Sequence, residues 1–212
     1  SIVKNINCVY PTLTYPCHTS MVTGVYPKKH GIYHNEKFDP NKENKDWYWY
    51  SKDIKAKTII DVAKENNLTT SSVLWPVMGA NPNIDYNIAE IWAPSREDDP
   101  RETFERSSSK VIMDGIYNRH CHYIDWKLEP NMDLFGVNCS VDIIKEYKPD
   151  LMLIHLATLD HTRHNYGLFN DEVDKALKMN DKWLGDIIQA TKDAGTYKDT
   201  NFIRSEERRV GK

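Results

Sequence analysis

The sequence lacks the patterns that mark several common classes of protein. No apolar run approaches the roughly 18 residues of a membrane-spanning helix, so no membrane span is expected in this chain. Its four cysteines, at Cys8, Cys17, Cys121 and Cys139, show neither the C-x-x-C pairing of a structural zinc site nor the density of a disulfide scaffold. The formal net charge of −3 argues against a protein that coats a nucleic-acid polymer.

The 212 residues are 40% hydrophobic, which is enough to bury a sizeable core. Strand-like and helix-like segments alternate, which predicts an α/β fold with a mostly parallel sheet flanked by helices. Residues 150–157 form an almost continuous apolar run, typical of a strand buried on both faces. Loops are expected at 36–50 and 79–101. A second strand is expected at 69–75, and helices at 15–24, 58–64, 101–117, 133–147 and 170–194.

Local signals indicate where two of these helices begin and end. Thr14 is a candidate cap for the first helix, Pro16 suits its first turn, and Gly24 suits its exit. Thr58 followed three residues later by Asp61 predicts a capping box at the start of the second helix.

Two groups of polar residues could carry chemistry. Ligands of open α/β sheets bind beyond the carboxyl ends of the strands, so the segment after Ala157 is a candidate site. There, Asp160 and His164 offer a carboxylate and an imidazole for zinc or a similar ion, although such a pair is also a common surface ion pair or turn. Thr14 places a hydroxyl at the start of a helix, where the unpaired amides favour an anion such as phosphate. Its alternative role is only to cap that helix. The hydroxyl becomes a nucleophile only with a base or a metal, which Asp160 and His164 could supply.

The run from Tyr10 to Ile32, YPTLTYPCHTSMVTGVYPKKHGI, resembles a known motif. It is similar to the nucleophile segment of the type I phosphodiesterases and nucleotide pyrophosphatases, a family of the alkaline phosphatase superfamily. That segment has the pattern P-T-x-T-[FY]-P-N-H followed by V-T-G-x-x-P-x-x-H-G-I, whose second Thr corresponds to Thr14. Asp160-x-x-x-His164-x-x-Gly167 resembles the family's later D-x-x-G-H-x-x-G motif.

The resemblance implies an alkaline phosphatase-like fold and a metal-dependent hydrolase. Thr14 would be both nucleophile and metal ligand, and would form a phosphothreonine intermediate. Asp160 and His164 would hold one of two divalent ions, expected to be Zn. Backbone N–H groups near Tyr15, together with Cys17, would bind the substrate. The expected partner is a small-molecule phosphate diester or pyrophosphate, with phosphomonoesters, phosphonates and sulfate esters left open.

The chain departs from the family pattern at two positions. Cys17 stands where nucleotide-cleaving relatives usually have an Asn that contacts the phosphate, and Arg163 replaces the Gly before the metal-binding His. A thiol is a weaker hydrogen-bond donor than an amide, so the departure at Cys17 leaves the nucleotide preference open. Cys17 could also be a small buried hydrophobic residue without a catalytic role.

The resemblance also implies metal ligands that this sequence does not contain. Only Thr14, Asp160 and His164 match a set of about six ligands for a two-metal site. Residues 1–203 are therefore expected to be a partial domain, incomplete at both ends, with a strand opening at 201–203. The competing hypothesis is a catalytically incomplete fragment that at most binds anions. No compartment is assigned.

The end of the chain carries an unusual string. Residues 204–212, RSEERRVGK, resemble the translation of a common DNA-sequencing adapter, which predicts a non-native tail. The alternative is an ordinary charged C-terminus.

Three other groups of residues have both a functional and a structural interpretation. The tract 120–122, His-Cys-His, could bind metal but is more typical of a polar surface. The aromatic run 47–50 could stack on a planar leaving group or pack under a loop. His30 is expected to be structural, and Lys28 and Lys29 to be solvated.

Overall fold

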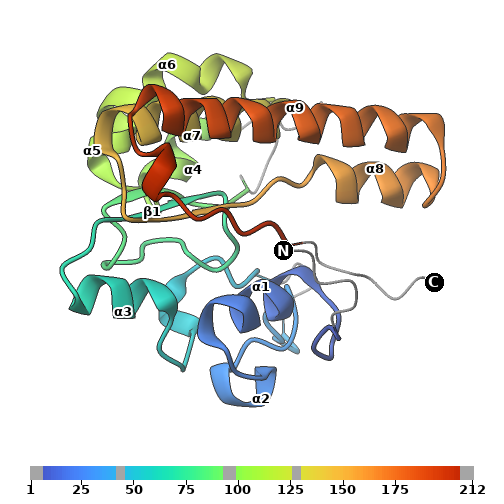
Figure 1. Cartoon of the computed structure of the whole chain (residues 1–212). Coiled ribbons are helices and arrows are strands. Elements are labelled where there is room, and N and C mark those ends of the chain that lie inside the picture. Colours follow the sequence, from blue (N-terminus) through green and yellow to red (C-terminus); the bar gives the residue numbers. More distant parts are fainter. Residues whose placement is uncertain (1–6, 42–45, 93–98, 126–129, 206–212) are drawn as a thin grey trace.

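At the centre of the computed structural model, which describes residues 7–41, 46–92, 99–125 and 130–205, is a parallel sheet (Figure 1). In these ranges the strands are β1 (Thr70–Val73), β2 (Tyr86–Ile88) and β3 (Leu151–Ile154), in the order β2-β1-β3. Both neighbours of β1 run parallel to it, and Val73 lies opposite Ile88 and Ile154. The α/β class with a parallel sheet is confirmed.

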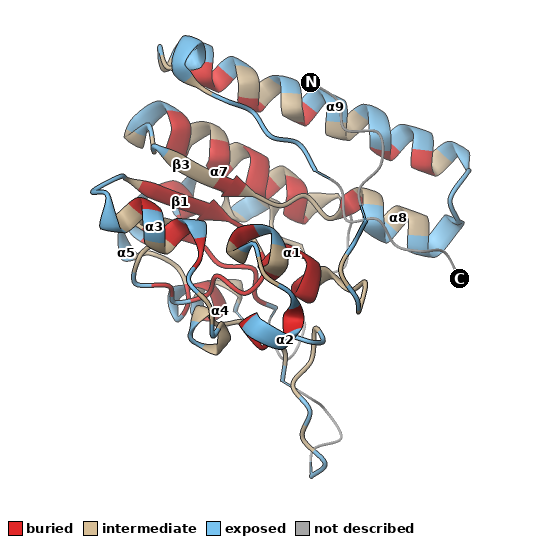
Figure 2. Ribbon diagram, turned by 60° about the horizontal axis from the view of Figure 1, so that its bottom comes forward, coloured by how far each residue is buried: buried red, intermediate tan, exposed pale blue. Residues whose placement is uncertain are grey.

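Helices cover both faces of this sheet (Figures 1 and 2). On one face lie α7 (Asn131–Tyr147) and α9 (Asp171–Asp193), and on the other lie α1 (Thr14–Thr23) and α3 (Ile59–Glu65). The remaining described helices are α2 (Pro27–His30), α4 (Pro100–Glu105), α5 (Lys110–Ile112), α6 (Asn118–His120), α8 (Thr158–Tyr166), a π-helix (Met113–Tyr117) and 3₁₀ turns at Ser51–Asp53, Cys121–Tyr123 and Tyr197–Asp199. None of the described helices is long and apolar enough to span a bilayer.

Side chains of β3 pack against helices on both faces of the sheet. Successive strand residues point to opposite faces. Leu153 packs in a cluster with Val22 of α1 and Ile60 of α3. Ile154 packs against Trp183 on the opposite face. The strand is shorter and less buried than predicted, and of its four residues only Leu153 is buried, because β3 is an edge strand of the described sheet.

The helix starts follow local capping rules, with one correction. Thr58 and Asp61 form the predicted capping box of α3. Helix α1, however, is capped by Leu13, which is extended and whose carbonyl accepts the first helical hydrogen bond, from Cys17 N at 3.0 Å. Thr14 is therefore the first residue of the helix and not its cap. Gly24 ends α1 in the left-handed region, at a φ of 66°, as predicted.

The predicted helix at 101–117 is wrong as a single element. It is broken between α4 and α5 by serines that hydrogen bond to the edge of β2. Ser109 Oγ accepts from Asn87 N at 2.8 Å, and Ser108 Oγ accepts from Ala89 N at 3.1 Å. These bonds satisfy strand amides, which would otherwise lack a partner on that side, and they favour a turn over a continuous helix.

Two further expectations are corrected. Strand β2 lies inside the predicted loop 79–101. Residues 201–203 form no strand, and Ile203 is 94% exposed. A strand requires a neighbour for its backbone hydrogen bonds, and no strand of the described residues pairs with this segment. Most of the tail at 204–212 lies outside the described residues.

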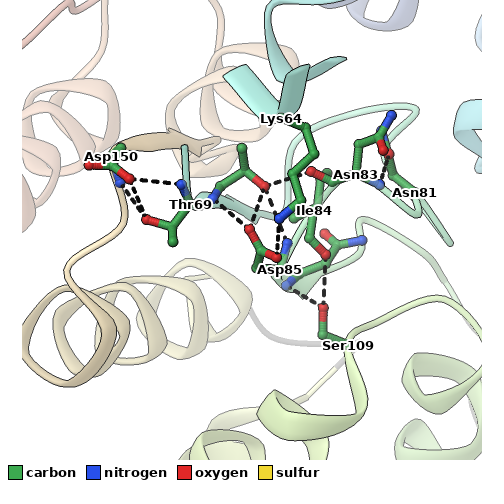
Figure 3. A network of polar contacts seen from close by, with 10 residues as sticks. Lys64, Thr69, Asn81, Asn83, Ile84, Asp85, Ser109 and Asp150 are labelled. Carbon is green, nitrogen blue, oxygen red and sulfur yellow. Dashed lines mark hydrogen bonds and ion pairs between the residues drawn. The ribbon is translucent and has the colours of Figure 1, made fainter. Parts of the chain in front are cut away.

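The amino ends of the three strands are joined by a network of polar contacts, shown in Figure 3. We call Lys64, Thr69, Thr70, Asp85 and Asp150 the amino-end network. Asp85, before β2, accepts from Thr70 N at 2.9 Å and pairs with Lys64 at 2.5 Å. Asp150, before β3, accepts from both the amide and the hydroxyl of Thr69, at 2.7 Å each. This network therefore holds the strands in register at the end of the sheet opposite the candidate site.

Candidate active site

Thr14 lies half-buried at the start of α1. The next amide, Tyr15 N, donates to Asn35 Oδ1 at 3.0 Å, so the Asn35 side chain lies beside the helix start. The amide expected to face a phosphate is thus already hydrogen bonded. Asn35 was missed by sequence reasoning, because a contact across 20 residues leaves no local signal.

The side chains of Tyr15 and Cys17 are both buried. Tyr15 is 0% exposed, and its ring packs against Trp47 and Trp49 at centroid distances of 5.4 and 6.1 Å. The packing interpretation of the aromatic run is confirmed. Tyr15 can offer a substrate only its backbone. Cys17 is 2% exposed, and its sulfur lies 3.2 Å from that of Cys8.

Two imidazoles lie in contact beneath Thr14. The rings of His18 and His155 are 4.6 Å apart, and His18 Nδ1 donates to the Thr14 carbonyl at 2.7 Å. His155, just after β3, donates from Nδ1 to the Leu74 carbonyl at 3.2 Å. The donor role of each Nδ1 follows from its partner, because a carbonyl oxygen can only accept.

Burial keeps both imidazoles neutral. Burial, followed by the neighbouring His155, lowers the pKa of His18 to about 3, although the Thr14 carbonyl and the Asp160 carboxylate act in the opposite direction. Burial likewise lowers the pKa of His155 to about 4. The ring of His18 on α1 contacts that of His155, which lies between the end of β3 and the start of α8. The starts of α1 and α8 therefore lie at the same end of the sheet.

Two buried carboxylates, Glu90 and Asp133, lie at the same end of the sheet as these histidines. We call His18, Glu90, Asp133 and His155 the carboxyl-end cluster. Glu90 Oε1 lies 3.8 Å from His155 Nδ1. Burial, together with Glu90, raises the pKa of Tyr15 well above its usual value. The cluster lies where β1, β2 and β3 end, which is the location expected for a ligand site in a parallel sheet. Sequence reasoning missed all four residues as a group, because they come from four separate segments.

Asp133 fixes the start of α8. Ala157, at the N-cap of α8, has no side chain that could cap the helix. Instead, Asp133 of α7 accepts from Ala157 N at 3.0 Å and from Thr158 N at 2.8 Å. Asp133 is 1% exposed, and burial raises its pKa despite these two hydrogen bonds. A buried carboxylate from another helix thus supplies the cap that α8 lacks.

Asp160 and His164 lie one turn apart on α8, with His164 Nε2 3.6 Å from Asp160 Oδ1. Their side chains are 50% and 52% exposed, so a cation from solvent can reach both. A carboxylate oxygen and an imidazole nitrogen are suitable ligands for a divalent ion such as zinc, and they fit it chemically. Within the described ranges, no three His, Cys, Asp or Glu side chains gather as a ligand set.

The two remaining histidine candidates have structural partners, and the two lysines are exposed. His120 lies 2.8 Å from Asp142 at the end of a short helix. His30 is fully buried and accepts from Ile32 N at 3.1 Å, which confirms its structural role. Lys28 and Lys29 are exposed, as expected.

Together these features define an α/β protein with a polar site at the carboxyl edge of a parallel sheet. The sequence profile of the type I phosphodiesterase / nucleotide pyrophosphatase family matches residues 1–204. The chain belongs to this family.

Curated relatives are similar over almost the whole chain. Mouse ectonucleotide pyrophosphatase/phosphodiesterase family member 1 is 27% identical over 209 residues, which cover 94% of this chain. Venom phosphodiesterase 2 of Crotalus adamanteus is 25% identical and also covers 94%. The chain spans only 19% and 22% of these two relatives.

Two solved structures share the fold. Murine ectonucleotide pyrophosphatase / phosphodiesterase 5 has a TM-score of 0.57 and 21% identity, covering 92% of this chain and 45% of that one. Phosphonoacetate hydrolase from Sinorhizobium meliloti has a TM-score of 0.56 and 18% identity, covering 86% of this chain and 44% of that one. The alkaline phosphatase-like fold is confirmed.

Proposed function

We propose that this chain carries the nucleophile and one metal-binding helix of a hydrolase that cleaves phosphate diesters or pyrophosphates. The observation that carries the proposal is spatial. Thr14 of the family's nucleophile motif begins α1, and Asp160 and His164 of its later motif lie together on α8. The two helices are linked through His18, which contacts the Thr14 carbonyl and the ring of His155, a residue just before α8.

Each residue has a distinct role in this proposal. The Thr14 hydroxyl loses its proton and attacks phosphorus, the bond to the alcohol or phosphate leaving group breaks, and that group leaves with a proton. The resulting phosphothreonine keeps the remaining substituent of the substrate, and water then hydrolyses the bond between Thr14 and phosphorus. The positive end of the α1 dipole would favour the negative charge of the phosphate oxygens, while Tyr15 N keeps its hydrogen bond to Asn35 Oδ1. Asn35 and Cys17 lie beside this helix start and would orient the phosphate.

Asp160, His164 and the Thr14 hydroxyl would hold divalent ions, for which we propose Zn. Bound there, such an ion would lower the pKa of a coordinated hydroxyl and neutralise phosphate charge. The buried Asp133 keeps the ligands on α8 at a fixed distance from the sheet, because it anchors the first two amides of that helix.

The substrate class follows from the relatives. Those with 25–27% identity are named as pyrophosphatases and phosphodiesterases, which favours a phosphate diester or pyrophosphate. The test compares a chromogenic phosphodiester with a phosphomonoester, a phosphonate and a sulfate ester, using protein from the complete open reading frame. Preference for the monoester, phosphonate or sulfate would contradict the substrate class.

The nucleophile is tested with Thr14→Ala, which should reduce turnover at least about a thousand-fold. The matched control is Thr12→Ala, since Thr12 lies in the same segment and its hydroxyl contacts only the Val9 carbonyl, at 3.4 Å, among the described residues. Undiminished turnover by Thr14→Ala would refute the proposal. An inactive wild-type protein would instead favour an anion-binding fragment.

The metal site is tested separately by zinc titration. Asp160→Asn and His164→Ala should each weaken zinc binding at least about tenfold, since each removes one ligand. His161→Ala is the matched control, because His161 is an exposed imidazole on the same helix. Equal losses in all three variants would contradict a specific site.

A further inference from the structure

Cys8 and Cys17 place two thiols in contact beside the start of α1. Their sulfur atoms are 3.2 Å apart, and neither residue forms a disulfide. A disulfide bond is about 2.05 Å long, so the sulfurs would need to approach by roughly 1 Å. Cys8 belongs to a segment without helix or strand, which can make this movement without breaking a regular element.

The two thiols differ in a way that suits stepwise oxidation. Cys8 is exposed, whereas Cys17 is 2% exposed and lies against Cys8. A small molecule can therefore reach Cys8 first, and Cys17 can then attack the sulfur of Cys8.

We propose that Cys8 and Cys17 form a modification site that a low-molecular-weight disulfide, such as oxidised glutathione, converts to an intramolecular disulfide. The Cys8 thiolate attacks one glutathione sulfur and releases one glutathione thiol. The Cys17 thiolate then attacks the Cys8 sulfur of the mixed disulfide and releases the second. The protein loses two protons and two electrons, and the glutathione disulfide becomes two thiols.

The disulfide would act on the proposed catalytic site, and this part of the inference rests on the proposed function. The ring closed by the bond contains Thr14, which lies between the two cysteines in the sequence. Oxidation also removes the S–H group of Cys17, which is then no longer a hydrogen-bond donor to a phosphate oxygen. We expect turnover to fall about tenfold, less than the loss of a strong oxyanion donor, because a thiol is a weak one.

The modification is tested without reference to activity. The protein is incubated with oxidised glutathione, its remaining thiols are alkylated, and its peptides are identified by mass spectrometry. The expected product joins Cys8 to Cys17 and disappears after treatment with dithiothreitol. Cys8→Ser should not form it, whereas the matched variant Cys121→Ser should. Alkylation of both Cys8 and Cys17, or a bond between Cys121 and Cys139 instead, would overturn the proposal.

The effect on the site is tested by turnover of a chromogenic phosphodiester before and after oxidation. We expect a reversible fall in the wild-type protein and no change in Cys8→Ser. Equal turnover of the oxidised and reduced forms would overturn the link to the site. If the reduced protein shows no Thr14-dependent turnover, the proposed function fails, while peptide identification still decides whether the two thiols pair.

Discussion

The pKa values of polar groups are shifted by different causes at the amino and carboxyl ends of the parallel sheet. At the amino ends, the hydroxyl and amide of Thr69 lower the pKa of Asp150. Burial alone would raise the pKa of Asp85, but hydrogen bonds from Lys64 and Thr70 outweigh it and lower the pKa. At the carboxyl ends, burial is the larger effect and favours the neutral forms of His155 and Asp133.

This difference distinguishes a structural network from a candidate functional site. The amino-end network gains stability from paired charges, whereas the carboxyl-end cluster buries groups that would be more stable in water. Strongly shifted pKa values in a cluster at the mouth of a sheet are typical of functional sites, although ion-pair networks also produce them. The two ends should therefore respond differently to substitution and to pH.

The largest effect is expected for Asp133→Ala in the carboxyl-end cluster. This change removes the acceptor of the partly buried Ala157 amide and of the buried Thr158 amide, at about 1–3 kcal/mol each. We expect a loss of about 3 kcal/mol in the free energy of unfolding, measured with urea, and zinc binding weaker by about tenfold. Asp133→Asn retains one carbonyl acceptor and should recover part of both losses. An unchanged urea midpoint would contradict the capping role.

The second largest effect is expected on the free energy of unfolding when the pH is lowered. A folded-state pKa of about 4 for His155, against 6.5 for an ordinary histidine, means that the unfolded chain binds more protons between these values. Stability should thus fall as pH decreases from 6.5 to about 4, by up to about 1.4 kcal/mol per pH unit for this residue.

The measurement is the free energy of unfolding across this pH range. His155→Asn keeps an N–H group for the Leu74 carbonyl but does not titrate there, so its profile should be flatter. His161→Asn, at an exposed position, should retain the wild-type slope. Parallel profiles for wild type and His155→Asn would show that His155 is not held neutral by burial.

A smaller effect is expected for Asp85→Ala in the amino-end network. The substitution removes the ion pair with Lys64 and the acceptor of Thr70 N, which should cost about 1–2 kcal/mol. Zinc affinity should not change, because Asp85 lies at the opposite end of the sheet. A loss of zinc binding equal to that of Asp133→Ala would remove the distinction between the two ends.

The smallest effect is expected for Asp150→Ala, at about 0.5–1 kcal/mol, because this carboxylate is exposed and its bonds to Thr69 compete with water. Because its pKa is lowered, its contribution should be lost only as the pH falls below the ordinary carboxylate value of 3.8. Urea unfolding at pH 7 and at about pH 3 checks both expectations. A larger loss than for Asp85→Ala would reverse the predicted order.

The sequence predicted those parts of the fold that have strong local signals. Strand β1, the capping box at Thr58 and the ends of α9 follow from residues within each element. Strand β2 has only three residues, too few to show a periodic pattern. The break before α5 depends on Ser108 and Ser109 reaching the edge of that strand.

Of the candidate site, only the residues that belong to the two sequence motifs could be predicted. Thr14, Asp160 and His164 were selected from two short patterns, and their catalytic roles remain predictions. Asp133 and Glu90 reach the site through tertiary contacts that have no counterpart in local sequence. Cys17 was considered for the site, but its contact with Cys8 depends on how the preceding segment folds back onto α1.

The most direct test of the central claim is to identify the residue that receives the phosphoryl group. Protein from the complete open reading frame, loaded with zinc, is mixed with a phosphodiester, stopped with acid during turnover, digested and examined by mass spectrometry. The account predicts a phosphoryl group on Thr14 that is absent from Thr14→Ala. A phosphoryl group on a different residue, with turnover preserved in Thr14→Ala, would contradict it.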